Sequence, residues 1–322
     1  MILRRTLSLA AILATFLAFA LPTSAARAAD KLNIVATVSM IGDALTAISG
    51  DRAEVTLLMG EGVDPHLYRQ TQSDIAAMVR ADAVFWNGLY LEAQLEEFLE
   101  KLAESKPVYA LGEAVPVDRR LSNADYSDRY DPHIWMTPEL WRYAVEAARD
   151  ALTELDPQGA QVYAANTEAY LEELDRLAAF ARESLATVPQ EKRVLITAHD
   201  AFGYFGRGYD FEVVGIQGLS TESEAGLQRV DEIVNMIVDR DIEAIFVETS
   251  VSERNVRALI EGAGARGHKV VVGGQLFSDA MGSAGTYTGT YIGMIDSNVT
   301  VITNALGGNA PAAGLNGKLA GS

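Results

Sequence analysis

The chain has 322 residues, no cysteine and a formal net charge of −18. The missing cysteine excludes disulfides, thiolate metal ligands, a cysteine nucleophile and a lipid anchor attached through cysteine. An acidic surface repels nucleic acid and anionic lipid, so neither is expected as a partner, and roughly 290 residues after a leader suit two compact domains.

Residues 1–28 have the pattern of a secretory signal peptide. Arg4 and Arg5 form a basic start, residues 6–21 are apolar, and Ala26 and Ala28 offer small residues for cleavage. The apolar stretch is shorter than the roughly 20 residues that cross a bilayer. We therefore predict a secreted, periplasmic protein with no lipid anchor and no other direct membrane anchor.

Residues 29–156 are predicted to form an N-terminal α/β lobe, because short apolar runs alternate there with helical patterns. The predicted strands are 33–38, 54–58, 83–87 and 108–109. The predicted helices are 40–49, 72–80, 91–103 and 138–155. Strands that alternate with helices favour a parallel sheet covered on both faces.

Residues 157–188 predict one long linking helix. The segment has no glycine after Gly159 and no proline after Pro157. Its apolar residues are spaced by three, four or seven, as one face of a helix requires: Tyr163, Tyr170, Leu174, Leu177, Ala181 and Leu185. About 28 helical residues extend about 42 Å. So long and stiff a connector predicts little relative motion of the lobes.

Residues 189–306 repeat the alternation and predict a C-terminal α/β lobe. The predicted strands are 193–197, 212–216, 244–247 and 269–272. The predicted helices are 201–207, 227–240, 253–265 and 291–306. The fold class is therefore α/β, with two Rossmann-like lobes of parallel sheet joined by one long rigid helix. The tail, 307–322, is rich in glycine, alanine and asparagine and is predicted to be disordered.

Three of the four histidines stand at turns or strand ends. His66 and His133 each close the phrase Asp-Pro-His, in which proline fixes its own φ and restricts the residue before it. His199 follows one predicted strand directly, and Asp279 follows the last strand. Ligands of open α/β sheets bind at the carboxyl ends of strands. Three imidazoles and one carboxylate complete the ligand set of a divalent transition metal, so His66, His133, His199 and Asp279 are the predicted ligands.

Other polar residues near this set have alternatives. Any single histidine is more often a core or capping residue, but four such positions from four segments are hard to explain by packing alone. Glu248 and Asn87 end strands, where they either orient an imidazole or serve as turn and capping residues. Asp200 starts a helix and should point elsewhere. His268 begins the last strand, opposite the end that leads to Asp279, so a surface position is expected.

Seven stretches carry a resemblance to a known family. They are Asp64-Pro65-His66, Ser73-Asp74-Ile75, residues 81–88, Asp131-Pro132-His133 with the three residues that follow, residues 197–205, residues 273–279, and Gly289-Thr290-Tyr291. Together they resemble the cluster A-I solute receptors of ABC importers, of the TroA type, and the resemblance covers nearly the whole chain after residue 28.

The resemblance implies a fold, a cargo and a partner. It implies two α/β lobes bridged by one long helix, and it assigns by position the same four ligands, His66, His133, His199 and Asp279. The cargo is one Zn²⁺ or Mn²⁺ ion, with Fe²⁺ as an alternative, and the partner is the membrane permease of an ABC transporter. The receptor is expected to be a monomer.

Two departures leave the metal open. Manganese receptors often carry glutamate where this chain has His199, whereas zinc receptors often carry a long loop rich in histidine before the second ligand. Here the corresponding segment, 116–130, is short and has no histidine.

Two rival functions are an exported zinc-dependent hydrolase and a metal-binding adhesin. Catalytic zinc usually keeps three protein ligands and an open position for water, and the chain has no H-E-x-x-H or G-x-S-x-G motif. A receptor that is not an enzyme is therefore the preferred interpretation.

Overall fold

Two α/β lobes with parallel strands make up the described part of the chain, residues 31–123 and 126–319 of a computed structural model. From Lys31 onward the chain forms one compact unit. The predicted signal peptide, 1–28, lies outside the described residues. None of the helices described has the length and apolar character required to cross a membrane.

The N-terminal lobe contains a four-stranded parallel sheet in the order β2-β1-β3-β4. Its strands are β1 (Leu32–Val38), β2 (Ala53–Met59), β3 (Ala83–Trp86) and β4 (Val108–Ala110). Its helices are α1 (Ser39–Ser49), α2 (Gln72–Arg80), α3 (Glu96–Ala103) and α4 (Pro138–Leu155). Central strand β1 pairs Ile34 with Val55 on one side and with Ala83 on the other. Its apolar run is buried, as expected of a parallel strand covered on both faces.

Helix α3 begins later than the sequence predicted. The predicted range was 91–103, but α3 starts at Glu96. Just before that range, Leu89 and Tyr90 have φ values of 54° and 68°. This left-handed backbone cannot continue into a right-handed helix without a turn. The turn brings Leu91 and Leu95 into the core instead.

The C-terminal lobe has four parallel strands in two hydrogen-bonded pairs, β7-β8 and β10-β9, and β7 packs beside β9. The strands are β7 (Val194–Thr197), β8 (Glu212–Gly215), β9 (Ala244–Glu248) and β10 (Val271–Leu276). The helices are α6 (Gly203–Tyr209), α7 (Leu227–Asp239), α8 (Arg254–Ala265) and α9 (Tyr291–Ala305). A second apolar core lies between these strands and α7 and α8.

Strand β10 extends farther than the predicted range, 269–272. Its register shifts between Val272 and Gly274, so a bulge carries the strand on to Leu276. A Cβ at Gly274 would lie 2.4 Å from Val301 of α9. Glycine therefore allows α9 to pack closely against the bulge, and the longer strand sets where Asp279 emerges.

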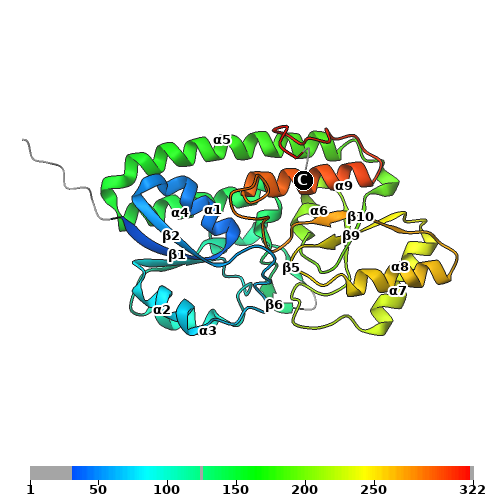
Figure 1. The fold of residues 1–322 in the computed structure, drawn as a ribbon, viewed down its shortest axis with the longest axis horizontal. Helices are drawn as coiled ribbons and strands as arrows, with labels where there is room; N and C mark the ends of the chain where they lie inside the picture. Colours follow the sequence, from blue (N-terminus) through cyan, green and yellow to red (C-terminus); the bar gives the residue numbers. More distant parts are fainter. Residues whose placement is uncertain (1–30, 124–125, 320–322) are drawn as a thin grey trace, which may run out of the picture. The chain divides into compact units, whose positions relative to one another are not determined.

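Helix α5 (Ala160–Leu185) packs against α1 and α4 of one lobe and α9 of the other (Figure 1). The Asp43 carboxylate links helix α1 to helices α5 and α9. It accepts a hydrogen bond from the Tyr170 hydroxyl of α5 at 3.0 Å and from the Tyr291 backbone N–H of α9 at 3.2 Å. The single long helix inside the predicted 157–188 range is thus bonded to both lobes. The exact lobe boundaries remain a prediction.

Short elements complete the fold. The structure adds a two-stranded antiparallel hairpin, β5 (Ser122–Asn123) and β6 (Tyr126–Tyr130), which the sequence did not predict. Single 3₁₀ turns are η1 (Gly50–Arg52), η2 (Leu111–Ala114), η3 (Val117–Arg119), η4 (Ile134–Met136), η5 (Pro157–Gly159) and η6 (Gln190–Lys192).

The tail prediction does not match the part that is described. Residues 307–319 lie against α9 rather than being disordered. The Leu315 N–H donates to both oxygens of Asp296, at 2.9 and 3.0 Å, and the Asn309 N–H donates to the Thr187 hydroxyl at 2.7 Å. The prediction counted only apolar burial, whereas polar contacts hold this segment.

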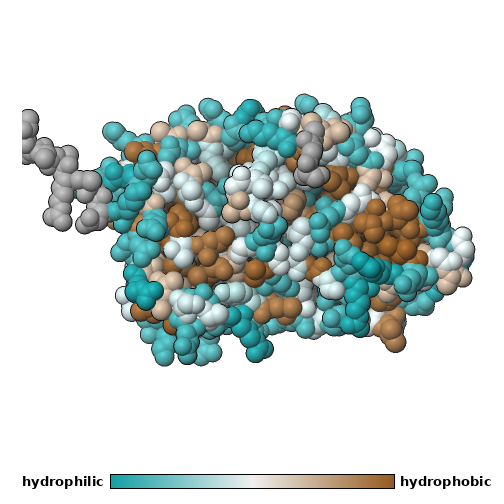
Figure 2. All heavy atoms as spheres, viewed as in Figure 1, coloured by the Kyte–Doolittle hydropathy of each residue, from teal (hydrophilic) through white to brown (hydrophobic). Residues whose placement is uncertain are grey.

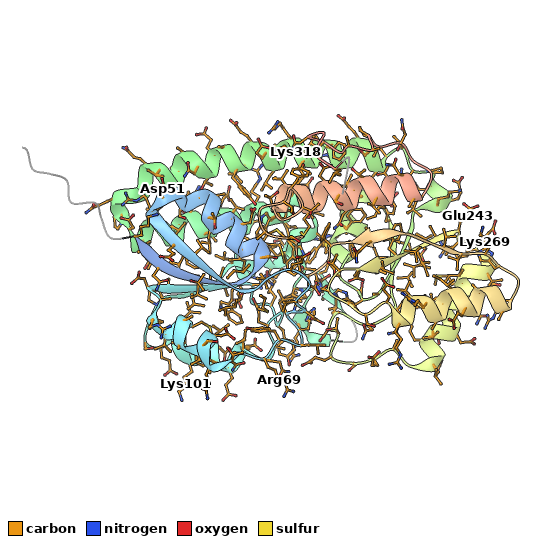
Figure 3. The ribbon with its side chains drawn as sticks, viewed as in Figure 1. Asp51, Arg69, Lys101, Glu243, Lys269 and Lys318 are labelled. Carbon is orange, nitrogen blue, oxygen red and sulfur yellow. The ribbon has the colours of Figure 1, made fainter. Side chains whose placement is uncertain are left out.

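Figure 2 shows hydrophilic residues along the edges of this face and several apolar patches, one of them near β9 and β10. Val271 and Val272 of β10 are nearly half exposed. In Figure 3 the labelled charged side chains Lys101, Glu243 and Lys269 point away from the ribbon. Lys269 lies near the end of β9 and β10 that is remote from the centre of the picture.

Candidate metal centre

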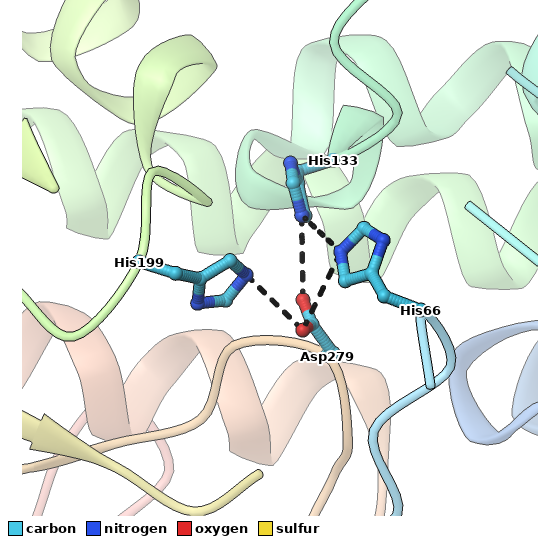
Figure 4. A group of neighbouring side chains, drawn as sticks. All are labelled: His66, His133, His199 and Asp279. Atoms are coloured by element: carbon cyan, nitrogen blue, oxygen red, sulfur yellow. Dashed lines mark hydrogen bonds and ion pairs between the residues drawn. The ribbon is translucent and has the colours of Figure 1, made fainter. Parts of the chain in front are cut away.

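The four predicted ligands meet in one buried cluster between the lobes (Figure 4). His66 follows β2 and His133 follows β6, whereas His199 follows β7 and Asp279 follows β10. Their side chains are nearly inaccessible, with exposed fractions of 1%, 0%, 0% and 2%. Each lobe thus contributes two of the four residues.

The ligand atoms face one another at short range. Asp279 Oδ2 lies 3.1 Å from His199 Nε2 and 3.9 Å from His66 Nε2, and Asp279 Oδ1 lies 3.5 Å from His133 Nε2. The Nε2 atoms of His66 and His133 are 3.4 Å apart. One donor atom from each residue lies within 4.8 Å of all the others.

The His133 imidazole is held by the aspartate of its own Asp-Pro-His phrase. Asp131 Oδ1 accepts the His133 backbone N–H at 2.9 Å and lies 2.7 Å from His133 Nδ1. A carboxylate on Nδ1 fixes the proton there and leaves Nε2 free as a donor to metal. The Tyr204 hydroxyl of α6 donates to the Asp131 carbonyl at 2.9 Å, which fixes the loop in turn.

The His199 imidazole is held in the same way by Glu248, at the end of β9. Glu248 Oε2 lies 2.6 Å from His199 Nδ1, and Oε1 accepts the His199 backbone N–H at 2.9 Å. Of the two interpretations of Glu248, orienting an imidazole is therefore confirmed geometrically. The residue is buried, and each of its two oxygens contacts His199 rather than capping a turn of its own.

His66 is supported differently. Asp64 Oδ1 accepts the His66 backbone N–H at 2.9 Å, but the ring Nδ1 of His66 has no hydrogen-bond partner. The other Asp64 oxygen accepts the Thr221 hydroxyl of the C-terminal lobe at 2.5 Å. The two Asp-Pro-His phrases thus share a backbone turn, while only the second uses its aspartate on the ring.

The backbone around Asp279 is anchored from both lobes. The Trp135 indole N–H donates to the Ser278 carbonyl at 2.7 Å, and the Tyr291 hydroxyl donates to the Trp135 carbonyl at 2.8 Å. Asn298 of α9 pairs with both the N–H and the carbonyl of Phe277. These contacts fix the loop that presents the carboxylate.

Several supporting residues were missed from the sequence. The sequence pattern was not used to predict a role for Asp131, although its place in the repeated Asp-Pro-His phrase indicates that it lies beside His133. Thr221, Trp135 and Asn298 lie far along the chain from the ligands that they support, so no local pattern marks them.

The remaining predicted positions fall outside the cluster. Asn87 donates to the Pro132 carbonyl at 3.1 Å, so it steadies the loop before His133 without touching the imidazole. Asp200 is not among the clustered residues. His268 is partly buried rather than a surface residue: its Nε2 lies 2.7 Å from the Ile242 carbonyl, away from the site.

Burial and mutual charge set the protonation of the cluster. Burial lowers the pKa of His66 to about 3. Burial also opposes the charged form of His199, but the Asp279 and Glu248 carboxylates outweigh it and raise the His199 pKa well above its usual value. Burial opposes the ionised form of Asp279, yet the three imidazoles hold its pKa far below its usual value. Without a metal the cluster therefore retains Asp279 as an anion beside a protonated His199.

The donor set fits a divalent transition metal. His199 Nε2 and both oxygens of Asp279 are buried, and within the described residues they face only one another and the other two imidazoles, with no further hydrogen-bond partner. Buried polar atoms are seldom left without one. Imidazole nitrogens with a carboxylate oxygen suit zinc, iron or manganese, and four donors suit tetrahedral coordination. Nothing in the group resembles a nucleophile with an adjacent base and an oxyanion site.

Comparison with known proteins identifies the family. The family model for the zinc-uptake complex component A, periplasmic, matches residues 34–305. The chain belongs to this family. It is 44% identical over 306 residues to the manganese-binding lipoprotein MntA of Bacillus subtilis, covering 94% of this chain and all of that protein.

A second relative is the zinc-binding protein TroA of Treponema pallidum, 44% identical over 281 residues, which are 87% of this chain and 91% of that protein. The solved structure of TroA superposes on this chain with a TM-score of 0.84 and covers 86% of this chain and 99% of that one. The α/β fold with two lobes, predicted from the sequence, is confirmed by this match.

The localisation prediction is corrected by the relatives' names. MntA is named a lipoprotein, and so is the metal ABC transporter substrate-binding lipoprotein SloC of Streptococcus mutans, 28% identical over 290 residues and covering 88% of this chain and 93% of that protein. Lipoproteins are lipid-anchored, so the prediction of a protein without a lipid anchor is contradicted. It was wrong because it inferred a location from an absent residue type.

Proposed function

We propose that this protein is the solute-binding component of a metal ABC importer. It captures one divalent transition metal ion between its lobes and delivers the ion to the membrane permease. One observation carries this proposal: four buried donor atoms, two from each lobe, lie within 4.8 Å of one another. The names of MntA, TroA and SloC, as metal-binding and substrate-binding proteins, support it.

The proposed ligands are His66 Nε2, His133 Nε2, His199 Nε2 and one or both oxygens of Asp279. Asp131 and Glu248 keep the Nδ1 atoms of His133 and His199 protonated, which directs both Nε2 lone pairs inward. Binding a dication replaces the proton on His199 and cancels the charge of Asp279. Metal and proton therefore compete for His199 Nε2, so metal affinity depends on pH.

The proposed cargo is Zn²⁺ or Mn²⁺, with Fe²⁺ as an alternative. MntA is named for manganese and TroA for zinc. Three imidazoles favour zinc over manganese by intrinsic affinity. Supply of metal and selection by the permease act in addition to this preference, so a titration of the isolated protein measures only the intrinsic part.

The rival hydrolase is less well supported. A catalytic zinc needs an open position where water is activated. Four protein ligands in a site this buried fill a tetrahedral shell and exclude solvent. We therefore propose that the protein is not an enzyme, and no observation favours the adhesin.

The domain division is part of the proposal. Residues 29–156 and 189–306 form the lobes, residues 157–188 form the linking helix, and one monomer binds one ion. Because α5 is bonded to α1 and α9 through Asp43, the proposed release of metal uses local loop movement rather than a wide hinge.

The test is a titration of metal-stripped protein with Zn²⁺, Mn²⁺ and Fe²⁺ by calorimetry. One ion per chain with affinity in the submicromolar range is expected, and binding should be lost in a His66→Ala, Asp279→Ala double variant. Absence of any stoichiometric binding by the folded wild-type chain would refute the proposal. Hydrolysis of ester, phosphate or peptide substrates by the zinc-loaded protein would instead support the rival function, a zinc-dependent hydrolase.

A further inference from the structure

A large acidic cavity lies on the N-terminal lobe beside the metal centre. Its volume is about 620 Å³, and four carboxylates line it, Glu96, Glu97 and Glu100 of α3 and Glu113 of η2. Two guanidinium groups, Arg120 and Arg129, share the wall. Arg120 is fixed by the carbonyl groups of Glu113 and Val115 at 2.6 and 2.9 Å.

A much smaller cavity, about 20 Å³, shares part of this wall and touches one residue of the metal centre. His66 lines it, together with Pro132 of the second Asp-Pro-His phrase and Leu219 and Ser220 of the C-terminal lobe. Four residues line both cavities: Leu89, Tyr90, Arg129 and Tyr130. The acidic cavity and the buried ligands are therefore separated by one layer of side chains.

The separating layer is a stacked pair. The Arg129 guanidinium lies 3.1 Å from the centre of the Tyr90 ring, a cation–π contact. Both groups belong to surface segments, so the contact can break without opening either apolar core. Its strength at a partly exposed site is modest, which suits a barrier that opens often.

The backbone that carries Tyr90 is strained. Gly88, Leu89 and Tyr90 have consecutive φ values of 73°, 54° and 68°. Two of these residues are not glycine, and strain of this kind is retained where the surrounding structure imposes it, often at ligand clamps and switches.

A buried carboxylate imposes this strain. Glu92 accepts the N–H groups of Asn87 and Gly88, at 2.8 and 3.2 Å, and the Thr37 hydroxyl at 2.6 Å. The turn is thus fixed at its base, and it carries Tyr90, which lines both cavities.

His66 connects the small cavity with the metal centre, because it is one of the four clustered residues and also lines this cavity. It is 1% exposed, it lines the small cavity, and its Nδ1 has no hydrogen-bond partner. The carboxylates on the other side of Tyr90 also influence one another. The pKa of Glu96 is raised by burial and by the charges of Glu100 and Glu113, with Arg129 opposing. A cation in the acidic cavity would relieve this repulsion.

We propose that the acidic cavity is the vestibule through which the divalent cation enters and leaves the buried centre, and that Tyr90 and Arg129 form the barrier between them. The proposal rests on the proposed function, because it needs a cation bound at the four ligands. The glutamates concentrate the ion by charge, and Arg129 swings from the Tyr90 ring towards them as the ion passes.

The first experiment separates rate from affinity. Association of Zn²⁺ is followed by stopped flow, and dissociation is followed by transfer to a chromogenic chelator, at low and high ionic strength. In the triple variant Glu96→Gln, Glu100→Gln, Glu113→Gln, the association rate of Zn²⁺ should fall about 10-fold at low salt, as expected for lost electrostatic focusing. The dissociation rate should change little, and the difference from wild type should shrink with salt.

The matched control removes the same charge elsewhere. Glu168, Glu172 and Glu183 are exposed on α5, and their triple glutamine variant should keep the wild-type association rate. Equal slowing in the control would show that only net charge matters. An unchanged rate in the vestibule variant would overturn the proposal.

The second experiment removes the barrier. In Tyr90→Gly the ring is lost while the left-handed backbone is kept without penalty. Association and dissociation rates should both rise by a common factor of about two to five, the effect of losing one exposed cation–π contact, with the affinity unchanged. Unchanged rates would show that the ion uses another path.

These outcomes are distinct from failure of the proposed function. If wild-type protein binds no Zn²⁺ at equilibrium, the proposed function fails. If all variants bind with wild-type affinity and wild-type rates, the function stands and the vestibule is refuted.

Discussion

Glu248→Gln isolates the contribution of one carboxylate behind a proposed ligand. The substitution keeps the side-chain volume in a fully packed position but removes the charge and one of two acceptor oxygens. Glu248 now serves both the ring Nδ1 of His199, at 2.6 Å, and its backbone N–H, at 2.9 Å. A glutamine has one oxygen, so one of these contacts must be lost or must face an NH₂ group.

The expected loss is about 10- to 100-fold in metal affinity. A hydrogen bond to a charged group contributes about 1.5–3 kcal/mol, and 1.4 kcal/mol corresponds to about tenfold in affinity. Removal of carboxylates that orient metal-bound histidines has effects of the same size. If the glutamine NH₂ faces Nδ1, the imidazole proton moves to Nε2 and blocks the donor atom itself.

The assay is a competition titration of Zn²⁺ against a chelator of known affinity at about pH 7. Glu243→Gln is the matched control, because Glu243 immediately precedes the same strand and forms an exposed ion pair with Lys192. Thermal unfolding of the metal-free variants checks that both are folded. Wild-type affinity in folded Glu248→Gln, or an equal loss in Glu243→Gln, would refute the reasoning.

Further predictions concern the ligands, the pH dependence of binding and of folding, thermal stability and motion. Metal binding should weaken by at least about tenfold in each of four single variants, His66→Ala, His133→Ala, His199→Ala and Asp279→Ala. The control His268→Ala should keep wild-type affinity. Wild-type affinity by calorimetry in any of the four would exclude the substituted residue from the site. The pKa of His199 is raised and that of His66 is about 3, so His199 carries the proton near neutral pH. Metal affinity should therefore fall by about tenfold per pH unit between about pH 7 and about pH 5. A flat pH profile in chelator competition would contradict this assignment. In metal-free protein the two histidines act oppositely on folding stability. His66 destabilises the fold as pH falls below its ordinary pKa of 6.5, whereas His199 stabilises the fold at low pH and loses that effect as pH rises through its raised pKa. Chemical denaturation across this pH range measures both effects. Metal should raise the melting temperature, by an amount that grows with the logarithm of its concentration. It should slow hydrogen exchange mainly in the loops of His199 and Asp279, with little change in the radius of gyration. A large contraction in small-angle scattering would instead indicate a wide hinge.

The sequence predicted most elements because strand and helix periods are local signals. The repeated Asp-Pro-His phrase marked His66 and His133, and the end of a predicted strand marked His199, since parallel strands present ligands at their carboxyl ends. Asp279 lies in the same cluster, although the last strand was predicted to end at 272, because the loop after β10 leads to the histidines.

What the sequence did not predict depends on side-chain contacts that hydrophobic periodicity does not register. Helix α3 was predicted to start too early because the sequence pattern did not reveal the left-handed turn before it. The buried Glu92 imposes this turn through hydrogen bonds from the N–H groups of Asn87 and Gly88. The extension of β10 follows from a bulge that packs on α9. The tail was judged by its apolar content, but Asp296 holds it by hydrogen bonds to the backbone. None of these partners is adjacent in sequence.

The placement of the ligands also bears on synthesis of the chain. His66 and His133 are made early, His199 later and Asp279 only after β10. Domains tend to fold in order of synthesis, so the first lobe can be complete while it holds only two imidazoles. Such a pair binds a dication much more weakly than the full set of four. A growing chain would therefore retain no ion, and capture would begin only when the last loop has docked on α9.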